Sequence, residues 1–325
     1  MSLIRFDGQS YERNADESVL ELLERHGHEV PNSCRAGLCQ SCLMQAVEGD
    51  PNPESQAGLK ETWKQQGMFL ACQCKPKGDL NITRADEVQA ALPARVVGLS
   101  ALSKDVLQVQ LESPQLEFRP GQFINVIRDD GLQRSYSLAN LQDGEPLTLH
   151  VRHIPGGAMS AWMHDDLQLG VDLEIQGPMG SCFYIDGKPE QDLLLVGTGT
   201  GLAPLYGIAR DALMQKHSGQ IILYHGGLTP EGLYLMDELR ALDEAHENFH
   251  YRPVVMRDGA DQGMPEGHVA DVVLSDLPKL KGWRSFLCGD PALVRQLQRK
   301  IYLAGADLAE IHIDAFEPSG QTKAA

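Results

Sequence analysis

The sequence predicts a mixed α and β fold in three parts: an α+β block, a block of antiparallel strands, and an α/β block with a parallel sheet. Two observations predict this fold class. Short strands separated by turns fill the first two parts, whereas unbroken apolar strands with helical segments between them fill the third. A length of 325 residues also gives room for three separate cores. We place the parts at residues 1–88, 93–188 and 189–325.

The first part combines short strands with an amphipathic helix. The helix is expected from about Ser18 to His26, because its apolar residues recur with helical spacing and Gly27 follows as a stop signal. Strands with one helix in so short a stretch are typical of an α+β unit. Extended segments are expected at 3–6, near Tyr11 and at 79–83, with a second amphipathic stretch at 58–67.

A linker is predicted over residues 85–93, ending at Pro93. The strands that follow it alternate in polarity, which favours an antiparallel barrel or sandwich. From about residue 190 the strands become apolar throughout, as in a parallel sheet that is buried on both faces and binds a nucleotide. The expected strands are 105–113, 121–127, 147–152 and 171–177, then 192–196, 220–225, 284–289 and 310–316.

Four cysteines in the first part carry the strongest chemical signal. Cys34, Cys39, Cys42 and Cys72 have the spacing C-x4-C-x2-C-x29-C, which is the plant-type ligand pattern of a [2Fe–2S] cluster. Several residues between them are small, so backbone N–H groups can turn toward the sulfur atoms and tune the reduction potential. Because such a cluster carries one electron at a time, the pattern predicts redox chemistry.

Other uses of these cysteines fit the sequence less well. Seven cysteines are an odd total and no secretory signal opens the chain, which argues against disulfides and for a reducing cytoplasm. A zinc site would leave Cys34 unused. A Rieske centre needs a histidine two residues after a cysteine, and the sequence has none. Cys72 completes the cluster spacing, so Cys74 is expected to be a bystander and Cys182 a core thiol.

Composition excludes several functions. The formal net charge of −17 argues against nucleic-acid binding, which needs a basic face. No apolar run approaches the length of a membrane span, so we expect no membrane association. The acidic surface could steer a basic protein partner, although solubility explains the charge about as well.

A glycine-rich segment follows the apolar strand 192–196. Gly197, Gly199 and Gly201 permit a tight turn and the close approach of a pyrophosphate, and Pro204 suits the first turn of a helix. An isolated G-x-G-x-G is a plain turn about as often as a nucleotide site. The position between a buried strand and a helix favours the nucleotide site.

The segment RSYSL at 134–138 suits a cofactor that carries a phosphate and a flat ring system. Arg134 could pair with phosphate, Tyr136 could pack on the ring and Ser137 could hydrogen-bond near its reactive nitrogen. An isolated R-x-Y-S is more often a solvated strand face. A helix expected after residue 156 could cap a diphosphate with its N-terminal amides. The residues that open this helix are Gly157, Met159 and Ser160.

Five ordered motifs together resemble the ferredoxin-type reductase components of bacterial multicomponent oxygenases, within the ferredoxin–NADP reductase superfamily. They are the cysteine pattern, R-x-Y-S, G-x-x-S, G-T-G-x-G-x-A-P and CGDP, and they span nearly the whole chain. The resemblance implies a β-grasp domain for the cluster, a flavin-binding barrel and a nicotinamide-binding sheet. It also implies three cofactors, a [2Fe–2S] cluster, FAD and NADH or NADPH.

The resemblance further implies a role for each matching residue. Cys34, Cys39, Cys42 and Cys72 would hold the cluster, while Ser137, Cys288 and Phe316 would act at the reacting atoms. Cys288 would lie beside the nicotinamide and Phe316 over the flavin. The alternative for Phe316 is an ordinary residue of the apolar core. A polar tail follows Phe316 and is expected to be mobile. The FAD set is Arg134, Tyr136, Ser137, Leu138, His150, Val151, Gly157, Met159, Ser160 and Phe316, and the NAD(P)H set is Gly199, Thr200, Gly201 and Cys288.

NADH is predicted over NADPH, because a 2′-phosphate needs an arginine or lysine near the end of the second strand. The first basic residue after the strand 220–225 is Arg240. Equal catalytic efficiency with NADPH would overturn this prediction.

The resulting hypothesis is an NADH-dependent reductase. Electrons would pass from NADH to FAD, to the cluster and to a terminal mono- or dioxygenase acting on aromatic or hydrocarbon substrates. One alternative is the same electron path serving another acceptor, such as a deoxysugar dehydratase. A second alternative is a ferredoxin-like carrier whose flavin and nucleotide parts are vestigial. We expect a cytoplasmic monomer whose partner is a terminal oxygenase or its ferredoxin or hydroxylase component.

Overall fold

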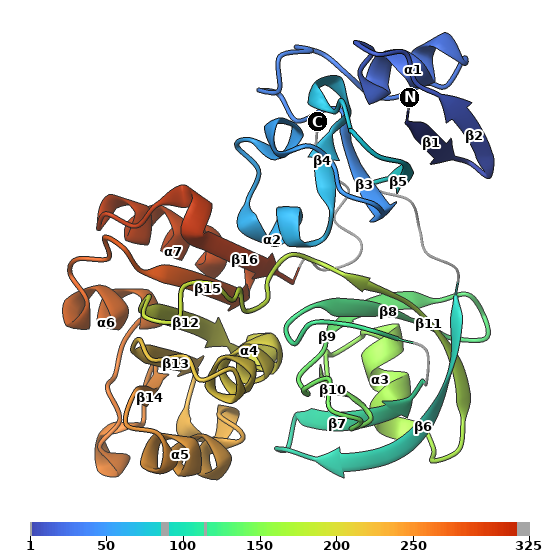
Figure 1. The fold of residues 1–325 in the computed structure, drawn as a ribbon. Coiled ribbons are helices and arrows are strands. Elements are labelled where there is room, and N and C mark those ends of the chain that lie inside the picture. Colours follow the sequence, from blue (N-terminus) through green and yellow to red (C-terminus); the bar gives the residue numbers. More distant parts are fainter. Residues whose placement is uncertain (1, 86–90, 114–115, 317–325) are drawn as a thin grey trace. The chain divides into compact units, whose positions relative to one another are not determined.

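Two units make up the chain, residues 1–88 and 89–325 (Figure 1). Each unit has its own apolar core. The computed structural model describes residues 2–85, 91–113 and 116–316. Most of the predicted linker and the polar tail after Phe316 lie outside these residues. No helix in the described ranges is long and apolar enough to cross a membrane.

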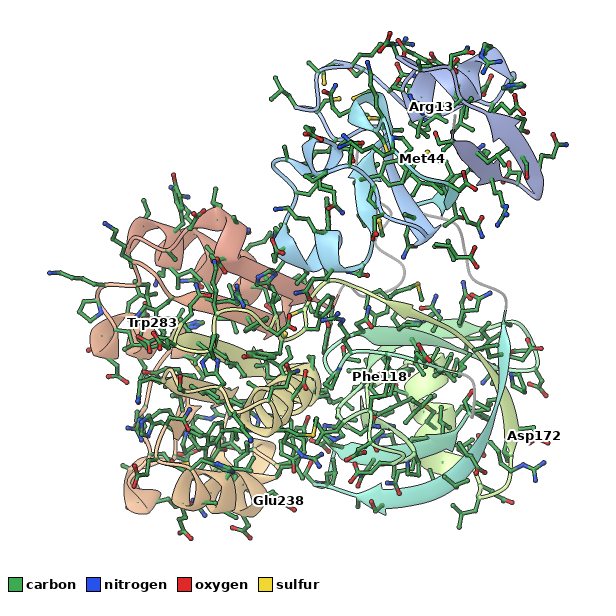
Figure 2. The ribbon with its side chains drawn as sticks, in the orientation of Figure 1. Arg13, Met44, Phe118, Asp172, Glu238 and Trp283 are labelled. Carbon is green, nitrogen blue, oxygen red and sulfur yellow. The ribbon has the colours of Figure 1, made fainter. Side chains whose placement is uncertain are left out.

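The first unit is a mixed five-stranded sheet in the order β2-β1-β5-β3-β4, covered by helix α1 (Val19–Arg25). The helix begins as predicted, because Ser18 and Glu21 form a capping box in which each side chain accepts from the other's backbone N–H. Its apolar face packs on the sheet in a core that includes Phe6 and Met44, the latter labelled in Figure 2. The other elements are β1 (Leu3–Phe6), β2 (Gln9–Glu12), β3 (Leu43–Glu48), α2 (Glu61–Gln65), β4 (Met68–Leu70) and β5 (Leu80–Arg84).

The second unit begins with a six-stranded antiparallel sheet in the order β10-β7-β6-β11-β8-β9. A bridge between Leu138 and Leu149 joins its two edges, which closes the sheet into a barrel around an apolar core (Figure 1). Short strands of alternating polarity suit such a barrel. The elements are β6 (Leu92–Ala101), β7 (Val106–Glu112), β8 (Phe123–Ile127), β9 (Gln133–Ser137), β10 (Leu147–Arg152), α3 (Ala158–Asp165) and β11 (Asp172–Met179).

The second unit ends in a five-stranded parallel sheet in the order β14-β13-β12-β15-β16. Helices α4 and α5 cover one face, and α6 and α7 cover the other (Figure 1). The strand order reverses between β12 and β15, and ligands of open α/β sheets bind at such switch points. The elements are β12 (Leu193–Thr198), α4 (Leu202–Met214), β13 (Ile221–Gly227), α5 (Met236–Ala245), β14 (Phe249–Val255), α6 (Val269–Asp276), β15 (Arg284–Gly289), α7 (Pro291–Leu303) and β16 (Ile311–Ala315).

The predicted fold class is confirmed, since an α+β unit, an antiparallel barrel and a parallel sheet follow one another along the chain. One local prediction is wrong. Pro93 was expected to end the linker, but it lies inside β6 opposite Glu174 of β11. A proline near the start of a strand loses only one donor, so β6 accommodates it. The contact pattern separates only residues 1–88 from the rest, and the boundary near 188 stays a prediction.

Candidate redox sites

The four predicted ligand cysteines of the first unit fall into two pairs. The backbone N–H of Cys39 donates to Sγ of Cys34 at 3.3 Å, and that of Cys34 donates to Sγ of Cys39 at 3.4 Å. Cys42 and Cys72 form the other pair, in which the two thiols interact directly. No three His, Cys, Asp or Glu residues of the described chain are grouped to hold one metal ion. Two pairs of thiols instead fit the two irons of a [2Fe–2S] cluster.

Backbone amides converge on the sulfur atoms of the cysteine loop. The N–H groups of Ala36 and Leu38 both donate to Sγ of Cys34 at 3.4 Å. This turn requires positive φ angles at Arg35, Gly37 and Gln40, of 51°, 77° and 58°. Amides that point at thiolates stabilise their negative charge and tune the potential of a cluster. The loop therefore fits the predicted cluster in both donor chemistry and shape.

The cysteines of this unit differ in their protonation. Hydrogen bonds lower the pKa of Cys39 to about 6, and the largest effect comes from the Ser41 side chain. Burial raises the pKa of Cys42 to about 11. Cys74 is 0% exposed in the apolar core, and burial raises its pKa to about 12. Cys74 hydrogen-bonds with Ser55, whereas Cys72 lies against the thiol of Cys42. This placement favours Cys72 over Cys74 as the fourth ligand.

In the second unit, the barrel and the parallel sheet meet at Ser137 and Asp314. Ser137 ends β9 of the barrel, and its Oγ donates to Oδ2 of Asp314 on β16 at 2.9 Å. Burial raises the pKa of Asp314 to about 6. Cys288 lies opposite Asp314 in the sheet register, and the N–H of Phe316 donates to the carbonyl of Gly289 at 2.9 Å. The three residues predicted to act at the reacting atoms therefore all lie at the ends of β9, β15 and β16.

The glycine-rich loop after β12 packs tightly on β15. A Cβ built on Gly201 would lie 2.4 Å from the carbonyl oxygen of Cys288, so only glycine fits there. A Cβ built on Gly199 would lie 3.1 Å from Nη1 of Arg152, which places that guanidinium over the loop. A 3-10 turn over Gly199–Gly201 runs directly into α4 and no side chain caps it, which leaves the N–H groups at the start of this turn for an anion. A loop of this shape at a helix start, beside a guanidinium, fits a pyrophosphate.

The barrel offers matching groups for a second diphosphate cofactor. The N-cap of helix α3 is Gly157, which has no side chain to bond the first N–H groups, so these groups can receive a phosphate. Ser160 shapes this turn, because its Oγ accepts from the N–H of Ile154 at 3.1 Å and donates to the carbonyl of Gly157 at 3.3 Å. Tyr136 of β9 is half-buried, and burial raises the pKa of its phenol. Arg134 lies on the same strand two residues earlier, within reach of the same ligand.

A buried pair of polar rings also joins the barrel to the parallel sheet. His150 of β10 and Tyr234 hydrogen-bond through Nδ1 and the phenol oxygen at 3.1 Å. The ring of Tyr234 also packs edge-on against that of His225 at the end of β13. Burial lowers the pKa of both histidines to about 3, so both are neutral at physiological pH. The contact therefore fixes the barrel against the sheet without a buried charge.

Three residues of the predicted FAD set have side chains that face away from a cofactor. Leu138, Val151 and Met159 lie in the barrel core at 0%, 0% and 2% exposure. Alternation along β10 explains Val151, since its neighbours His150 and Arg152 point out of the barrel. Only the backbone atoms of these three residues can face a ligand. The remaining predicted residues of the second unit gather at the β12 and β15 ends, β9 and the start of α3.

Sequence reasoning missed three residues of this site: Asp314, Arg152 and Tyr234. Asp314 lies near the carboxyl end of the predicted strand 310–316, where ligands of a parallel sheet bind, and this position could have drawn attention to it. Arg152 ends a strand that was predicted, two residues beyond His150. Tyr234 gives no local signal, because its partner lies 84 positions earlier in the chain.

Comparison with protein families gives three matches in the same order. Residues 4–77 match the 2Fe-2S iron-sulfur cluster binding domain, 93–184 the oxidoreductase FAD-binding domain and 195–299 the oxidoreductase NAD-binding domain. The chain is 33% identical over 329 residues to the aromatic O-demethylase reductase subunit of Amycolatopsis sp., covering 96% of this chain and 97% of that protein. It is 31% identical to the naphthalene 1,2-dioxygenase system ferredoxin–NAD(P)+ reductase component of Pseudomonas putida, covering 94% and 95%.

Solved structures agree with these matches. The crystal structure of the Amycolatopsis cytochrome P450 reductase GcoB superposes with a TM-score of 0.68 at 30% identity, covering 98% of this chain and 99% of that one. The ferredoxin reductase in carbazole 1,9a-dioxygenase gives a TM-score of 0.64 at 25% identity, covering 97% and 98%. The predictions of an oxidoreductase and of its cluster, FAD and nicotinamide cofactors are confirmed. The chain belongs to the ferredoxin–NAD(P)+ reductase family whose members join a 2Fe–2S domain, an FAD-binding domain and an NAD-binding domain.

Proposed function

We propose that this chain is an NADH-dependent reductase that delivers electrons singly to a terminal oxygenase acting on aromatic or other hydrocarbon substrates. The relatives named for naphthalene, terephthalate and alkene oxygenase systems support this acceptor class. FAD, when bound, takes a hydride from the nicotinamide and gives up its two electrons one at a time. The chain's own residues bind, orient and shield the reacting partners.

The contact between Ser137 and Asp314 carries this proposal. It brings the strand of the R-x-Y-S motif onto the parallel sheet at the end of β15, where Cys288 and the glycine-rich loop lie. A flavin ring held by Tyr136 and Ser137 would therefore face a nicotinamide that enters over Gly201. Hydride transfer depends on such positioning and needs no acid–base pair.

Each phosphate-binding element has a separate task. The start of α3 and Arg134 would hold the FAD diphosphate, and the start of α4 with Arg152 would hold that of NADH. Ser137 would orient toward the reactive flavin nitrogen, with Asp314 setting the direction of its hydroxyl. Cys288 and Phe316 would bound the space for the nicotinamide.

The cysteine loop suits the electron exit. Leu38 is 83% exposed between two ligand cysteines, and Cys34 and Cys39 are themselves exposed. An apolar residue beside a solvent-facing pair of ligands gives a partner a desolvated contact close to the metal. The acceptor would dock over this loop.

We propose NADH as the preferred donor. Leu228 follows β13 and is 61% exposed where a 2′-phosphate would need a cation. The fold brings Arg257 to this place, since its N–H donates to the carbonyl of Leu228 at 3.2 Å. The neighbouring carboxylate of Asp258, with 3.6 Å between its Oδ2 and Nε of Arg257, offsets the positive charge of this exposed guanidinium.

Anaerobic titration of the purified holoprotein with NADH tests the proposal. NADH should bleach the absorbance of both the flavin and the cluster, and a catalytic efficiency clearly higher than with NADPH is expected. Reduction of neither centre by either nucleotide would refute the proposed function.

Capture of the acceptor on the immobilised reductase, followed by its identification as an oxygenase component, tests the partner. A dehydratase in its place would overturn the oxygenase assignment.

A further inference from the structure

Two thiols in the second unit lie against each other beside the nicotinamide site. The Sγ atoms of Cys182 and Cys288 are 3.7 Å apart, and the residues are 3% and 0% exposed. Cys182 comes from the segment after β11, and Cys288 comes from β15, 106 positions later in the chain. We propose that sustained exposure to peroxide closes these cysteines to a disulfide and slows hydride entry.

The local backbone suits such a closure. A disulfide needs its sulfur atoms about 2.05 Å apart, so the two sulfur atoms must approach by rotation of the side chains and a small shift of one segment. Cys288 is fixed, because β15 is hydrogen-bonded to β12 on one side and β16 on the other. Cys182 belongs to no helix or strand, so fewer backbone hydrogen bonds hold its segment than hold β15.

The pair of cysteines adjoins the proposed nicotinamide site as well as the apolar core. The carbonyl of Cys288 touches the glycine-rich loop at Gly201, and Asp314 lies opposite it in the register. Burial, the neighbouring thiol and the Asp314 carboxyl together raise the pKa of Cys288 well above its usual range. A protonated thiol reacts slowly, so ordinary turnover leaves the pair reduced and only sustained exposure to oxidant closes it.

The reaction needs one equivalent of a peroxide. One sulfur attacks a peroxide oxygen and loses its proton, which breaks the O–O bond and gives a sulfenic acid and one water. The second sulfur displaces the hydroxyl of the sulfenic acid and loses its own proton, which forms the S–S bond and a second water. The two thiols lose two electrons, and hydrogen peroxide gains them. A thiol reductant reverses the step.

Closure would act on turnover through Cys288. The disulfide removes the S–H group and fixes this sulfur on Cys182, so the wall of the nicotinamide site changes shape. Displacements of this size at a reacting centre reduce rates by about tenfold or more. This consequence rests on the proposed function, whereas formation of the disulfide does not.

The experiment treats the holoprotein with hydrogen peroxide, alkylates the remaining thiols under denaturing conditions and maps the peptides by mass spectrometry. A cross-link between the peptides of Cys182 and Cys288, 2 Da lighter than the dithiol, is expected in the wild type. NADH-driven ferricyanide reduction should fall by about tenfold as the cross-link forms and recover with dithiothreitol.

Two variants make the comparison specific. Cys182→Ser removes the pair, so peroxide should cause no loss of activity that dithiothreitol can restore. Cys74→Ser removes a buried thiol of the first unit instead and should behave as the wild type. The proposal fails if no cross-link forms under conditions that oxidise the ligand cysteines, or if Cys182→Ser shows the same reversible loss. The cross-link is mapped in the wild-type protein, so this measurement does not depend on whether a variant folds. If untreated protein fails to oxidise NADH, the proposed function fails while the mapping still tests the thiol pair.

Discussion

At the scale of single residues, Asp314 sets the chemistry of its neighbours. Its burial raises its pKa to about 6, close to physiological pH, and its partner Ser137 has only one hydrogen to donate. When Asp314 is ionised, Ser137 gives that hydrogen to the carboxylate. When Asp314 is protonated, it can donate to Ser137, whose own hydrogen is then free for the cofactor. The ionisation of one carboxyl therefore selects the direction of two hydrogen bonds.

Replacing Asp314 by asparagine should remove a pH dependence. We expect the wild-type rate of NADH-driven ferricyanide reduction to fall several-fold as pH rises through about 6, because Ser137 turns away from the flavin. The asparagine amide donates to Ser137 at every pH, so Asp314→Asn should stay at the low-pH level. Steady-state rates from pH 5 to 8 measure this. An unchanged inflection in the variant would show that another group titrates.

Leu228 offers a direct test of dinucleotide choice. Leu228→Arg places a guanidinium at the end of β13, where it can pair with the 2′-phosphate of NADPH. A charge-assisted hydrogen bond of this kind is worth about 1.5 kcal/mol, so kcat/KM for NADPH should rise about tenfold. Leu228→Met is the neutral control and should leave the ratio of the two nucleotides unchanged. Equal gains with NADH and NADPH would locate the adenosine ribose elsewhere.

At the scale of elements, the junction between β15 and its neighbours depends on one buried cation. Arg284 is 1% exposed at the start of β15, and it donates to Glu310 at 2.7 Å and to the carbonyl of Ile185 at 2.9 Å. Burial opposes the ionised carboxyl of Glu310, but bonds from Arg284 and Lys188 prevail and lower its pKa to about 2. The stability from this pair is present above about pH 4.5 and is lost as pH falls toward 2.

Removing the carboxylate should therefore destabilise the second unit. Glu310→Gln leaves the Arg284 charge buried without its counter-ion, and the free energy of unfolding should fall by about 3 kcal/mol at pH 7. Urea denaturation, monitored by the flavin fluorescence that rises when the cofactor is released, measures this free energy. The matched control is Asp172→Asn, which breaks the exposed pair with Arg95 and should leave the free energy of unfolding almost unchanged. Similar losses of unfolding free energy in both variants would mean that burial of the ion pair between Arg284 and Glu310 adds nothing to stability.

The turn between β12 and α4 has no room for a side chain. The Cβ of Gly201→Ala would lie 2.4 Å from the carbonyl oxygen of Cys288, so the loop must shift. We expect kcat/KM for NADH to fall at least about tenfold while FAD content is unchanged. Gly78→Ala is the control, since nothing lies within 4 Å of its Cβ. Normal NADH kinetics in Gly201→Ala would exclude this turn from the dinucleotide site.

At the scale of the whole molecule, prediction from sequence worked where chemistry is local and failed where it is not. The cysteine spacing, the helix from about Ser18 and the glycine-rich turn are each contained in a short segment, so their patterns can be read directly. The bond between Ser137 and Asp314 joins residues 177 positions apart, and only the packing of barrel on sheet creates it. Arg257 likewise reaches the end of β13 through strand order and not through sequence proximity.

The division into two units predicts that the two halves of the electron path can fail separately. The cysteine loop belongs to residues 1–88, whereas Ser137, Asp314, Cys288 and the glycine-rich loop belong to 89–325 with their own cores. A lost cluster ligand should therefore leave the reaction between NADH and flavin intact.

Cys42→Ser tests this separation, because it removes one thiol from the pair with Cys72 while the second unit keeps its sequence. Cytochrome c reduction, which takes single electrons from the cluster, should be abolished. Ferricyanide reduction should continue, since the flavin can support it alone. Cys74→Ser, a buried thiol of the same unit outside the ligand set, should retain both activities. Survival of both activities in Cys42→Ser would place the electron exit at the flavin and remove the cluster from the path.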